Sequence, residues 1–316
     1  MTTLTLRING TVSSQEVEAL LAQARQKLNA GEDVAIQAPF RTPKVRAPFI
    51  NLAKECGAHT EAIFVHQGIH RDLQIPTYAE SLNRIEILQD LQVDRQAAEF
   101  FQQNEKELVS DPVKVFRRLE REGALLKFIP EYKGTIGLDQ HSPYHTYSVF
   151  DHILEATAFV AGTSLKMVWT LLLHDIGKGY PGIKQFLGVI VEPYASYAKK
   201  ERVVIENGER IRNGLDSGAT YRVNGTDIPE QYVKTDLMGH FYDHENVGAQ
   251  LALKILPRMG YPIELALEVA TLIQFHMMMP RNMDTISPTS LKKWYAKVGP
   301  YASDLMMVRM ADNRGK

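Results

Sequence analysis

The stretch LLLHDIGKGYPG (residues 171–182) ends an apolar run with a histidine and an aspartate side by side. The run has the composition of a buried helix, and Lys178 follows three residues after Asp175. Two interpretations are open. His174 and Asp175 are either the polar end of a helix or two ligands of one metal ion, and the rest of the sequence has to decide between them.

Other polar residues interrupt apolar helices after residue 145. Each lies beside or inside a run that should face a core, as in VFDHIL (149–154), LIQFH (272–276) and VRMAD (308–312). A buried histidine or aspartate costs free energy unless it is hydrogen-bonded, paired or bound to metal, and a single one is more often a satisfied core residue. Several of them on separate helices favour one shared site. These residues are His152, the pair His174 and Asp175, the pair His240 and His244, His276, and Asp312.

The residue types in this set indicate the kind of metal. Imidazoles and carboxylates together suit a divalent Mn, Fe, Co, Ni or Mg ion rather than a structural zinc, which usually takes thiolates. Cys56 is the one cysteine of the sequence, so a thiolate cluster within the chain is excluded. A metal ion with open positions lowers the pKa of bound water from about 15.7 toward 7. Lys178 would add a positive charge there; the alternative is a solvated lysine at a helix C-terminus.

The composition is that of a soluble globular protein. The chain has 316 residues, of which 44% are hydrophobic, and a net charge of −1. This balance gives no bulk electrostatic argument for binding nucleic acid or an anionic membrane, and it leaves a local basic groove open. The sequence has no secretory signal and no apolar run of about 18 residues. We therefore expect a cytoplasmic protein without a membrane partner, and the single Cys56 fits a reducing compartment.

The first third of the chain alternates strands and helices. TLTLRI (3–8), DVAIQA (33–38) and EAIFVH (61–66) predict strands, and helices over 14–30 and 42–57 lie between them. Strand, helix, strand, helix, strand with short connections predicts a parallel sheet of the doubly wound kind. We assign this α/β domain to residues 1–75.

The rest of the chain is mainly helical. Apolar residues at three- and four-residue spacing predict helices in a connector over 76–140, beginning with 78–92, and in a domain over 141–316. Residues 183–235 interrupt this pattern, because VVIENGERI (203–211) and YRVNGTDI (221–228) each place Asn-Gly between strand-like flanks and so predict β-hairpins. The predicted fold class is α+β, mainly α, with this β-hairpin region inserted in a helical domain.

Four segments carry a resemblance to a known family. They are GALLKFIPEYKGTIGLDQHSPYHTYSVFDHIL (123–154), LLLHDIGKG (171–179), FYDHENVGAQLALKIL (241–256) and LIQFHMMM (272–279). The order of their histidines and aspartates resembles that of the HD-domain metal-dependent phosphohydrolases. Among these, the segments are most similar to the HD domain that follows the nucleotidyltransferase in tRNA CCA-adding enzymes. The resemblance covers about residues 112–316.

The resemblance implies one or two divalent metal ions and a role for each matching residue. His152, His174, Asp175 and Asp312 match the ligands of one ion, and His244 and His276 match the extra histidines of two-metal members. Asp175 and Lys178 are the predicted catalytic residues. His240 is a possible auxiliary ligand, one helical turn from His244, and His145 a possible residue of the substrate mouth. The sequence ends four residues after Asp312; such helices often continue, so we expect a clipped end.

The N-terminal domain carries a second resemblance. QAPFRTPKVRAPFINLAKECGAHTEAIFVH (37–66) and LNRIEIL (82–88) resemble the middle of a P-loop kinase, but the phosphate loop GxxxxGK[ST] is absent from the sequence. We therefore expect kinase activity to be lost; the alternative is a doubly wound domain of another origin. Basic residues of this domain would bind phosphate or RNA backbone, or form a solvated face. They are Arg41, Lys44, Arg46, Arg71 and Arg84.

These observations predict an enzyme that uses a metal-activated water to cleave a phosphoester. Both resemblances favour a nucleotide or RNA end with a 2′,3′-cyclic phosphate or a 3′-phosphate as the substrate. The alternatives are a small-nucleotide phosphohydrolase and, in another class, a non-catalytic scaffold that binds RNA or nucleotides. The insertion at 183–235 either covers the site or is a charged structural hairpin. Its basic residues are Lys199, Lys200, Arg202, Arg210, Arg212 and Arg222.

Overall fold

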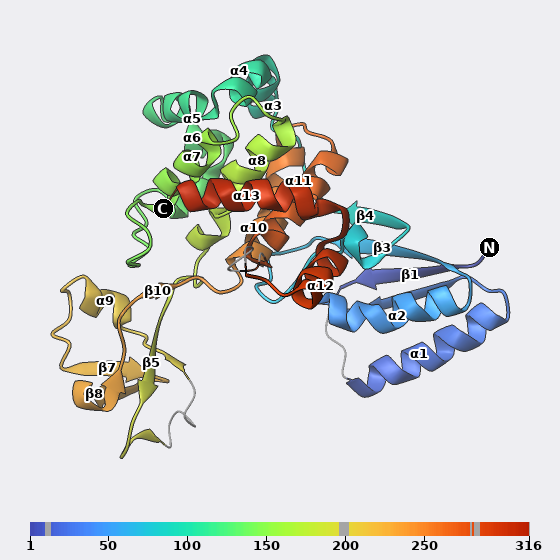
Figure 1. The fold of residues 1–316 in the computed structure, drawn as a ribbon, viewed down its shortest axis with the longest axis horizontal. Coiled ribbons are helices and arrows are strands. Elements are labelled where there is room, and N and C mark those ends of the chain that lie inside the picture. The colour runs from blue at the N-terminus through green and yellow to red at the C-terminus, as the bar shows by residue number, and fades with distance from the viewer. Residues whose placement is uncertain (10–13, 196–201, 279, 281–284, 316) are drawn as a thin grey trace.

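The computed structural model describes residues 1–9, 14–195, 202–278, 280 and 285–315. A small sheet with two helices lies at one end of the molecule, a helical body in the middle, and the insertion on the other side of that body (Figure 1). Within the described part of the chain, no helix has the length and apolar character needed to cross a membrane.

The N-terminal sheet is parallel, as its sequence pattern predicts. Its strands are β1 (Thr3–Ile8), β2 (Val34–Ala38), β3 (His59–Val65) and β4 (Arg84–Leu88), in the order β2-β1-β3-β4. Helix α1 (Ser14–Asn29) connects β1 to β2, and α2 (Pro43–Glu55) connects β2 to β3. Pro48 lies inside α2 without ending it.

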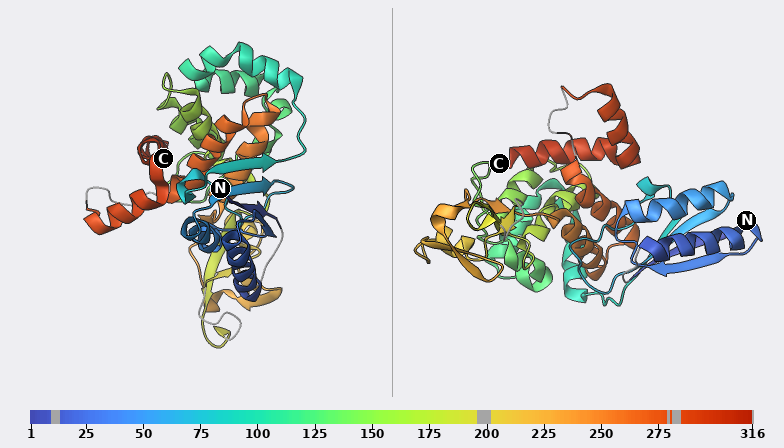
Figure 2. Two further views of the ribbon diagram at one scale, coloured as in Figure 1. Left: turned by 90° about the vertical axis from the view of Figure 1, so that its right-hand side faces the viewer. Right: turned by 90° about the horizontal axis from the view of Figure 1, so that it is seen from below.

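The helices of this domain cover one face of the sheet. Leu4, Leu6 and Ile8 of β1 are buried, whereas Arg7 and Gln37 on the other face are exposed. This alternation is the pattern of a sheet with one packed and one solvated face. Helices α1 and α2 contact each other and lie on the same side of the sheet (Figures 1 and 2). A doubly wound domain has helices on both faces, so this domain differs in that respect.

One predicted helix is wrong. Residues 78–92 form a short 3-10 helix, η1 (Tyr78–Glu80), followed by β4. Ser81 has a left-handed φ of 66°, which ends the helical turn. Ile85 and Ile87 then alternate with polar residues and pair with β3, so the period of two decides the structure. The sheet therefore extends past the predicted boundary at residue 75.

The helical body supplies most of the core. The apolar cluster is continuous from β1 in the sheet to the leucines at 171–173 in the body. The elements of the body are α3 (Arg95–Gln103), α4 (Glu105–Ser110), α5 (Pro112–Arg121), α6 (Leu125–Phe128), η2 (Pro130–Gly134), α7 (Val149–Ala158), α8 (Leu165–Leu173), η3 (Ile176–Gly179), α10 (His244–Arg258), α11 (Ile263–Phe275), η6 (His276–Met278), α12 (Pro288–Val298), η7 (Gly299–Tyr301) and α13 (Ala302–Arg314).

The insertion has its own small apolar core, which includes Phe186, Tyr221 and Ile228. Its central strand β5 pairs antiparallel with β6, β9 and β10. Strand β10 leads the chain back into the helical body (Figure 1). The elements are β5 (Gln185–Ile190), β6 (Val203–Val204), α9 (Gly208–Arg212), β7 (Thr220–Val223), β8 (Thr226–Pro229), η5 (Glu230–Tyr232), β9 (Val233–Lys234) and β10 (Gly239–His240).

Only one of the two Asn-Gly pairs forms a hairpin in the described part of the insertion. Asn224 and Gly225 join β7 to β8 with φ values of 49° and 74°, as a two-residue hairpin turn requires. The prediction for Asn207-Gly208 is wrong, because helix α9 begins there. The Asn207 side chain instead forms two hydrogen bonds with the backbone of β7. Its Oδ1 accepts from Arg222 N, and its Nδ2 donates to Thr220 O.

Two basic residues of the insertion are paired with neighbouring carboxylates. Arg210 pairs with Asp216, and Arg222 pairs with Asp227. Arg202 and Arg212 are exposed. Lys199 and Lys200 lie outside the described residues. The pairs favour the interpretation of a structural hairpin decorated with charge.

Candidate metal centre

Five helices or helix ends bring the predicted metal-binding residues together. His152 comes from α7, and His174 and Asp175 follow the last residue of α8. His244 begins α10, and His276 follows α11. Asp312 lies in the last turn of α13. Because α8 is buried along its length, its end places His174 and Asp175 at the centre of the helical body.

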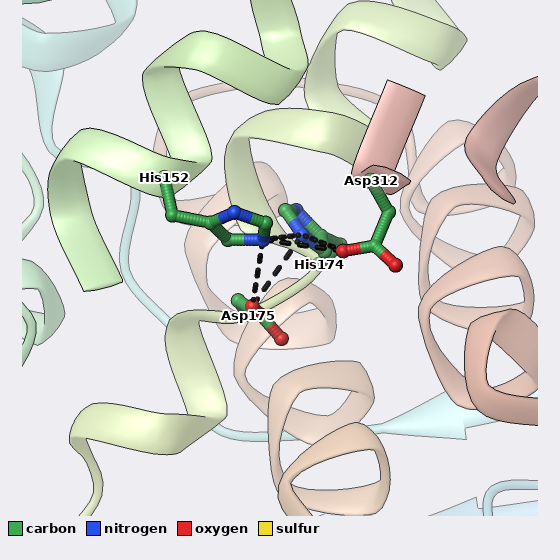
Figure 3. A group of neighbouring side chains, drawn as sticks. All are labelled: His152, His174, Asp175 and Asp312. Carbon is green, nitrogen blue, oxygen red and sulfur yellow. Dashed lines mark hydrogen bonds and ion pairs between the residues drawn. The ribbon is translucent and has the colours of Figure 1, made fainter. Parts of the chain in front are cut away.

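The first group of ligands surrounds His152 (Figure 3). His152 Nε2 lies 3.2 Å from Asp175 Oδ2 and 3.2 Å from Asp312 Oδ1. His174 Nε2 lies 3.2 Å from His152 Nε2 and 3.5 Å from Asp175 Oδ2. One atom from each of the four residues therefore faces a common point, and all four side chains are buried.

The second group uses the other oxygen of Asp175. Asp175 Oδ1 lies 3.1 Å from His244 Nε2 and 3.8 Å from His276 Nε2. The two imidazole Nε2 atoms are 3.3 Å apart. The Asp175 carboxylate thus belongs to both groups, as a carboxylate that bridges two metal ions would.

The orientation of the four imidazoles fits metal binding. The Nδ1 atoms of His152, His174, His244 and His276 lie 2.6–2.8 Å from the backbone carbonyl oxygens of Gly315, Leu171, Phe241 and Ile273. A carbonyl only accepts, so each Nδ1 carries a proton and each Nε2 points inward, where the neutral form of the ring offers a lone pair. Two such lone pairs about 3.2 Å apart repel each other unless a proton or metal ion lies between them.

The electrostatics of the centre favour bound positive charge. Burial lowers the pKa of His174, and burial together with His244 lowers the pKa of His276 to about 3, so both rings are neutral ligands. Although burial favours the neutral acid, Lys178 and the imidazoles hold the pKa of Asp175 well below its usual range. Burial also opposes charge on His152, but the carboxylates of Asp175 and Asp312 raise its pKa to about 9.

Lys178 is not a solvated lysine. Its Nζ lies 2.7 Å from Asp175 Oδ2, donates to Gln140 Oε1 at 2.9 Å, and lies 5.5 Å from the centre of the Phe241 ring. The side chain is 9% exposed. Helix η3 turns it back toward Asp175, so its ammonium is held beside the carboxylate that the two groups share.

A cavity of about 250 Å³ opens in front of the ligands. Asp175, Lys178 and Asp312 form part of its wall, together with His145 and His240. The two predicted auxiliary histidines belong to neither ligand group of the described residues. The His145 ring packs against His152 at 5.3 Å between centres, and the His240 ring stacks on Tyr242 at 5.6 Å.

Sequence reasoning missed two residues of this wall. Gln140 holds Lys178 from 38 residues away in the chain; it lies in the segment 123–154, whose histidines alone were singled out. Arg309 Nη1 lies 3.5 Å from Asp312 Oδ2 and lines the cavity. Its position three residues before Asp312, on the same helical face, is a signal that would have identified it.

Four of the five basic residues of the N-terminal domain, all except Lys44, have structural partners in the described part of the chain. Arg46 is fully buried and pairs with Glu80, Arg71 donates to the backbone oxygens of Gly182 and Tyr242, and Arg84 pairs with Glu86. Arg41 pairs with Asp72. These contacts give the four arginines structural roles within the described residues.

Comparisons with known proteins give partial matches that include bifunctional uridylyltransferase/uridylyl-removing enzymes. The chain is 29% identical to that of Ruegeria pomeroyi over 99 residues, which are 25% of this chain and 11% of the enzyme. It is 25% identical to that of Azospirillum brasilense over 169 residues, 54% of this chain and 14% of the enzyme. It is 32% identical to that of Streptomyces coelicolor over 76 residues, which are 22% of this chain and 9% of the enzyme.

These matches span no more than about a seventh of each of these relatives. No family model matches the chain, and no solved structure matches it. The chain is therefore weakly similar to enzymes that carry out uridylyl transfer and removal, and it has two groups of buried histidines and aspartates able to hold a metal ion.

Proposed function

We propose that the chain is a metal-dependent phosphohydrolase of the HD type that cleaves a phosphoester. The observation that carries this proposal is the pair of ligand groups that share Asp175. A mixed set of imidazoles and carboxylates suits Mn, Fe, Co, Ni or Mg. When bound, such ions acidify water and offset the charge of phosphate oxygens. One or two ions would be held, by His152, His174, Asp175 and Asp312, and by Asp175, His244 and His276.

The side chains around the ligands have separate roles in this proposal. The backbone carbonyls that hold each Nδ1 fix the rings, which keeps every Nε2 in place without reorganisation. Lys178 and Arg309 present cations at the cavity wall, where they would bind and orient the phosphate. Gln140 positions the Lys178 ammonium. The proposed catalytic residues are thus Asp175 and Lys178.

We propose a nucleotide or RNA end with a 2′,3′-cyclic phosphate or a 3′-phosphate as the substrate. The resemblance to the HD domain of CCA-adding enzymes supports an RNA end. The relatives remove a uridylyl group, which is attached through its phosphate, and this supports a nucleotide phosphodiester. A small-nucleotide phosphohydrolase is the alternative within the same chemistry.

Metal content and turnover test this function together. The purified protein should contain about one or two metal ions per chain by mass spectrometry. It should hydrolyse p-nitrophenyl phosphoesters with Mn, Ni, Co or Mg, and a chelator should remove that activity. Comparing bis- with mono-p-nitrophenyl phosphate, and 2′,3′-cyclic CMP with 3′-CMP, separates diesterase from monoesterase. A protein without metal and without turnover under any ion would favour the non-catalytic scaffold.

Replacing Lys178 by methionine should lower kcat by roughly a hundredfold and leave the metal content unchanged. The reason is that the lost ammonium would stabilise charge that develops on the phosphate. Lys184→Met is the matched control, because Lys184 is equally buried and pairs with Glu209, but does not line the cavity. Steady-state kinetics of the three proteins check this, and equal losses in both variants would contradict the role of Lys178.

A further inference from the structure

A second cavity, separate from that of the metal centre, lies at the carboxyl edge of the N-terminal sheet. Strands β1 and β3 are neighbours, but the chain leaves them in opposite directions, toward β2 on one side and β4 on the other. In open parallel sheets, the crevice that forms where neighbouring connections diverge is where ligands bind. This edge of the sheet faces the helical body (Figure 1).

The cavity occupies that crevice and has a volume of about 430 Å³. Its wall includes residues that follow three strands: Asn9 after β1, Pro39 and Arg41 after β2, and Gln67, Gly68 and His70 after β3. This volume is in the range of sites for small molecules. It shares no lining residue with the cavity of the metal centre.

The wall after β2 is held in a strained conformation. Phe40 has a left-handed φ of 40° although it is not glycine, a strained conformation that persists only where the surroundings enforce it. The fully buried Arg46 enforces it by donating to Phe40 O at 2.5 Å, while its other nitrogens bind Glu80 at 2.7 Å. Arg41, the next residue, is thereby fixed at the cavity.

The wall after β3 is fixed from the helical body. Gln250 of α10 is fully buried; its Oε1 accepts from His70 N at 2.9 Å, and its Nε2 donates to His70 O and Leu73 O. Gln274 of α11 forms a similar pair of bonds with the backbone of Ile75. Both walls are therefore rigid before any ligand arrives, which reduces the entropy that binding would lose.

The side chains at the wall indicate the chemistry of the ligand. Arg41 supplies a cation, His70 an imidazole, and Asn9 and Gln67 supply amides, and the described lining includes no acidic residue. Arg41 pairs with Asp72, but the Asp72 side chain is 67% exposed. Such exposed pairs contribute little because solvent screens them, so an anion in the cavity can compete with Asp72 for the guanidinium.

We propose that this cavity binds a small molecule through a phosphate or carboxylate group held by Arg41. The guanidinium would bind the anion with two parallel hydrogen bonds, and the amides of Asn9 and Gln67 would contact the uncharged part of the molecule. This site is independent of the proposed hydrolysis, because its residues take no part in the metal centre.

Calorimetric titration of the full chain tests the proposal. The probes are inorganic phosphate, AMP and citrate, each added in the presence of EDTA so that no metal ion contributes. The same titrations are repeated with the Asp175→Asn variant, in which the metal centre is disabled. At least one probe should bind the wild type, and Arg41→Gln should weaken it by about tenfold or more. Arg25→Gln is the matched control, because Arg25 forms an exposed pair with Glu55 in the same domain, and its affinity should equal that of the wild type.

A gain of affinity gives the second readout. Asp72→Asn removes the competing carboxylate, so it should tighten binding by about two- to fivefold. Hydrogen exchange should show protection of residues 67–75 by the probe in the wild type. Equal affinity of the wild type and Arg41→Gln would overturn the proposal, and so would the absence of binding of every probe up to about 10 mM. Citrate binding without phosphate binding would identify a carboxylate ligand, and the reverse a phosphate.

Discussion

Replacing Asp175 by asparagine should abolish turnover and lower the metal content of the protein. The asparagine side chain would keep the shape of the aspartate but offer one neutral oxygen in place of two charged ones, whereas Asp175 gives Oδ2 to the first ligand group and Oδ1 to the second. The same change removes the carboxylate that pairs with Lys178. We expect kcat/KM to fall by at least about a thousandfold, which corresponds to about 4 kcal/mol.

Two further variants make this result specific. Asp151→Asn is the matched control, because Asp151 lies beside His152 in the sequence but pairs with Arg117 at the surface; its turnover should change by less than about twofold. Asp312→Asn removes a ligand from the first group alone and should reduce the metal content by less than Asp175→Asn does. Circular dichroism checks that each variant is folded. Full activity in Asp175→Asn would refute the metal-dependent mechanism.

Replacing Gly177 by alanine should destabilise the protein by at least about 3 kcal/mol. A Cβ atom at this position would lie 2.1 Å from the carbonyl oxygen of His244 and 2.8 Å from the backbone nitrogen of Gly248. Both contacts are with backbone atoms of α10, which cannot rotate away as a side chain would. Helix η3 would have to separate from α10, and Asp175 and His244 would move apart with it.

Urea unfolding and turnover measure the two consequences of this change. Gly182→Ala is the control, because Gly182 has a φ of 79° but no atom within 4 Å of its Cβ position. It should lose about 1 kcal/mol from backbone strain and keep its turnover. Equal stability of Gly177→Ala and the wild type would show that the close approach of η3 to α10 is not needed.

The residues of the candidate centre could be predicted because each one violates a local rule. His152, His174 and His276 lie in or directly after apolar helices, where burying a polar side chain costs free energy unless it is hydrogen-bonded, paired or bound to metal. Burial, periodicity and residue type are all visible in the sequence at such positions. The structure brings these residues together with Asp175, His244 and Asp312, and the auxiliary histidines remain on the cavity wall.

The features that were missed depend on contacts between distant residues. The spacing of Leu82, Ile85 and Ile87 is compatible with a helix as well as a strand, and only pairing with β3 decides between them. Asn207-Gly208 fails as a hairpin because its amide side chain binds the backbone of β7. Nothing in the sequence indicates the role of Gln140, because that role consists of accepting a hydrogen bond from the distant Lys178. Tertiary contacts override local propensity in each case.

The bond between His152 and Gly315 has a consequence for the order of folding. His152 Nδ1 lies 2.8 Å from an oxygen 163 residues further along the chain, and α13 also supplies Asp312. During synthesis, helices α7 and α8 therefore leave the ribosome long before the residues that orient and complete their ligands. Contacts of such long range form late in folding, so a nascent chain would present His152 and His174 before α13 adds Asp312 to their ligand group.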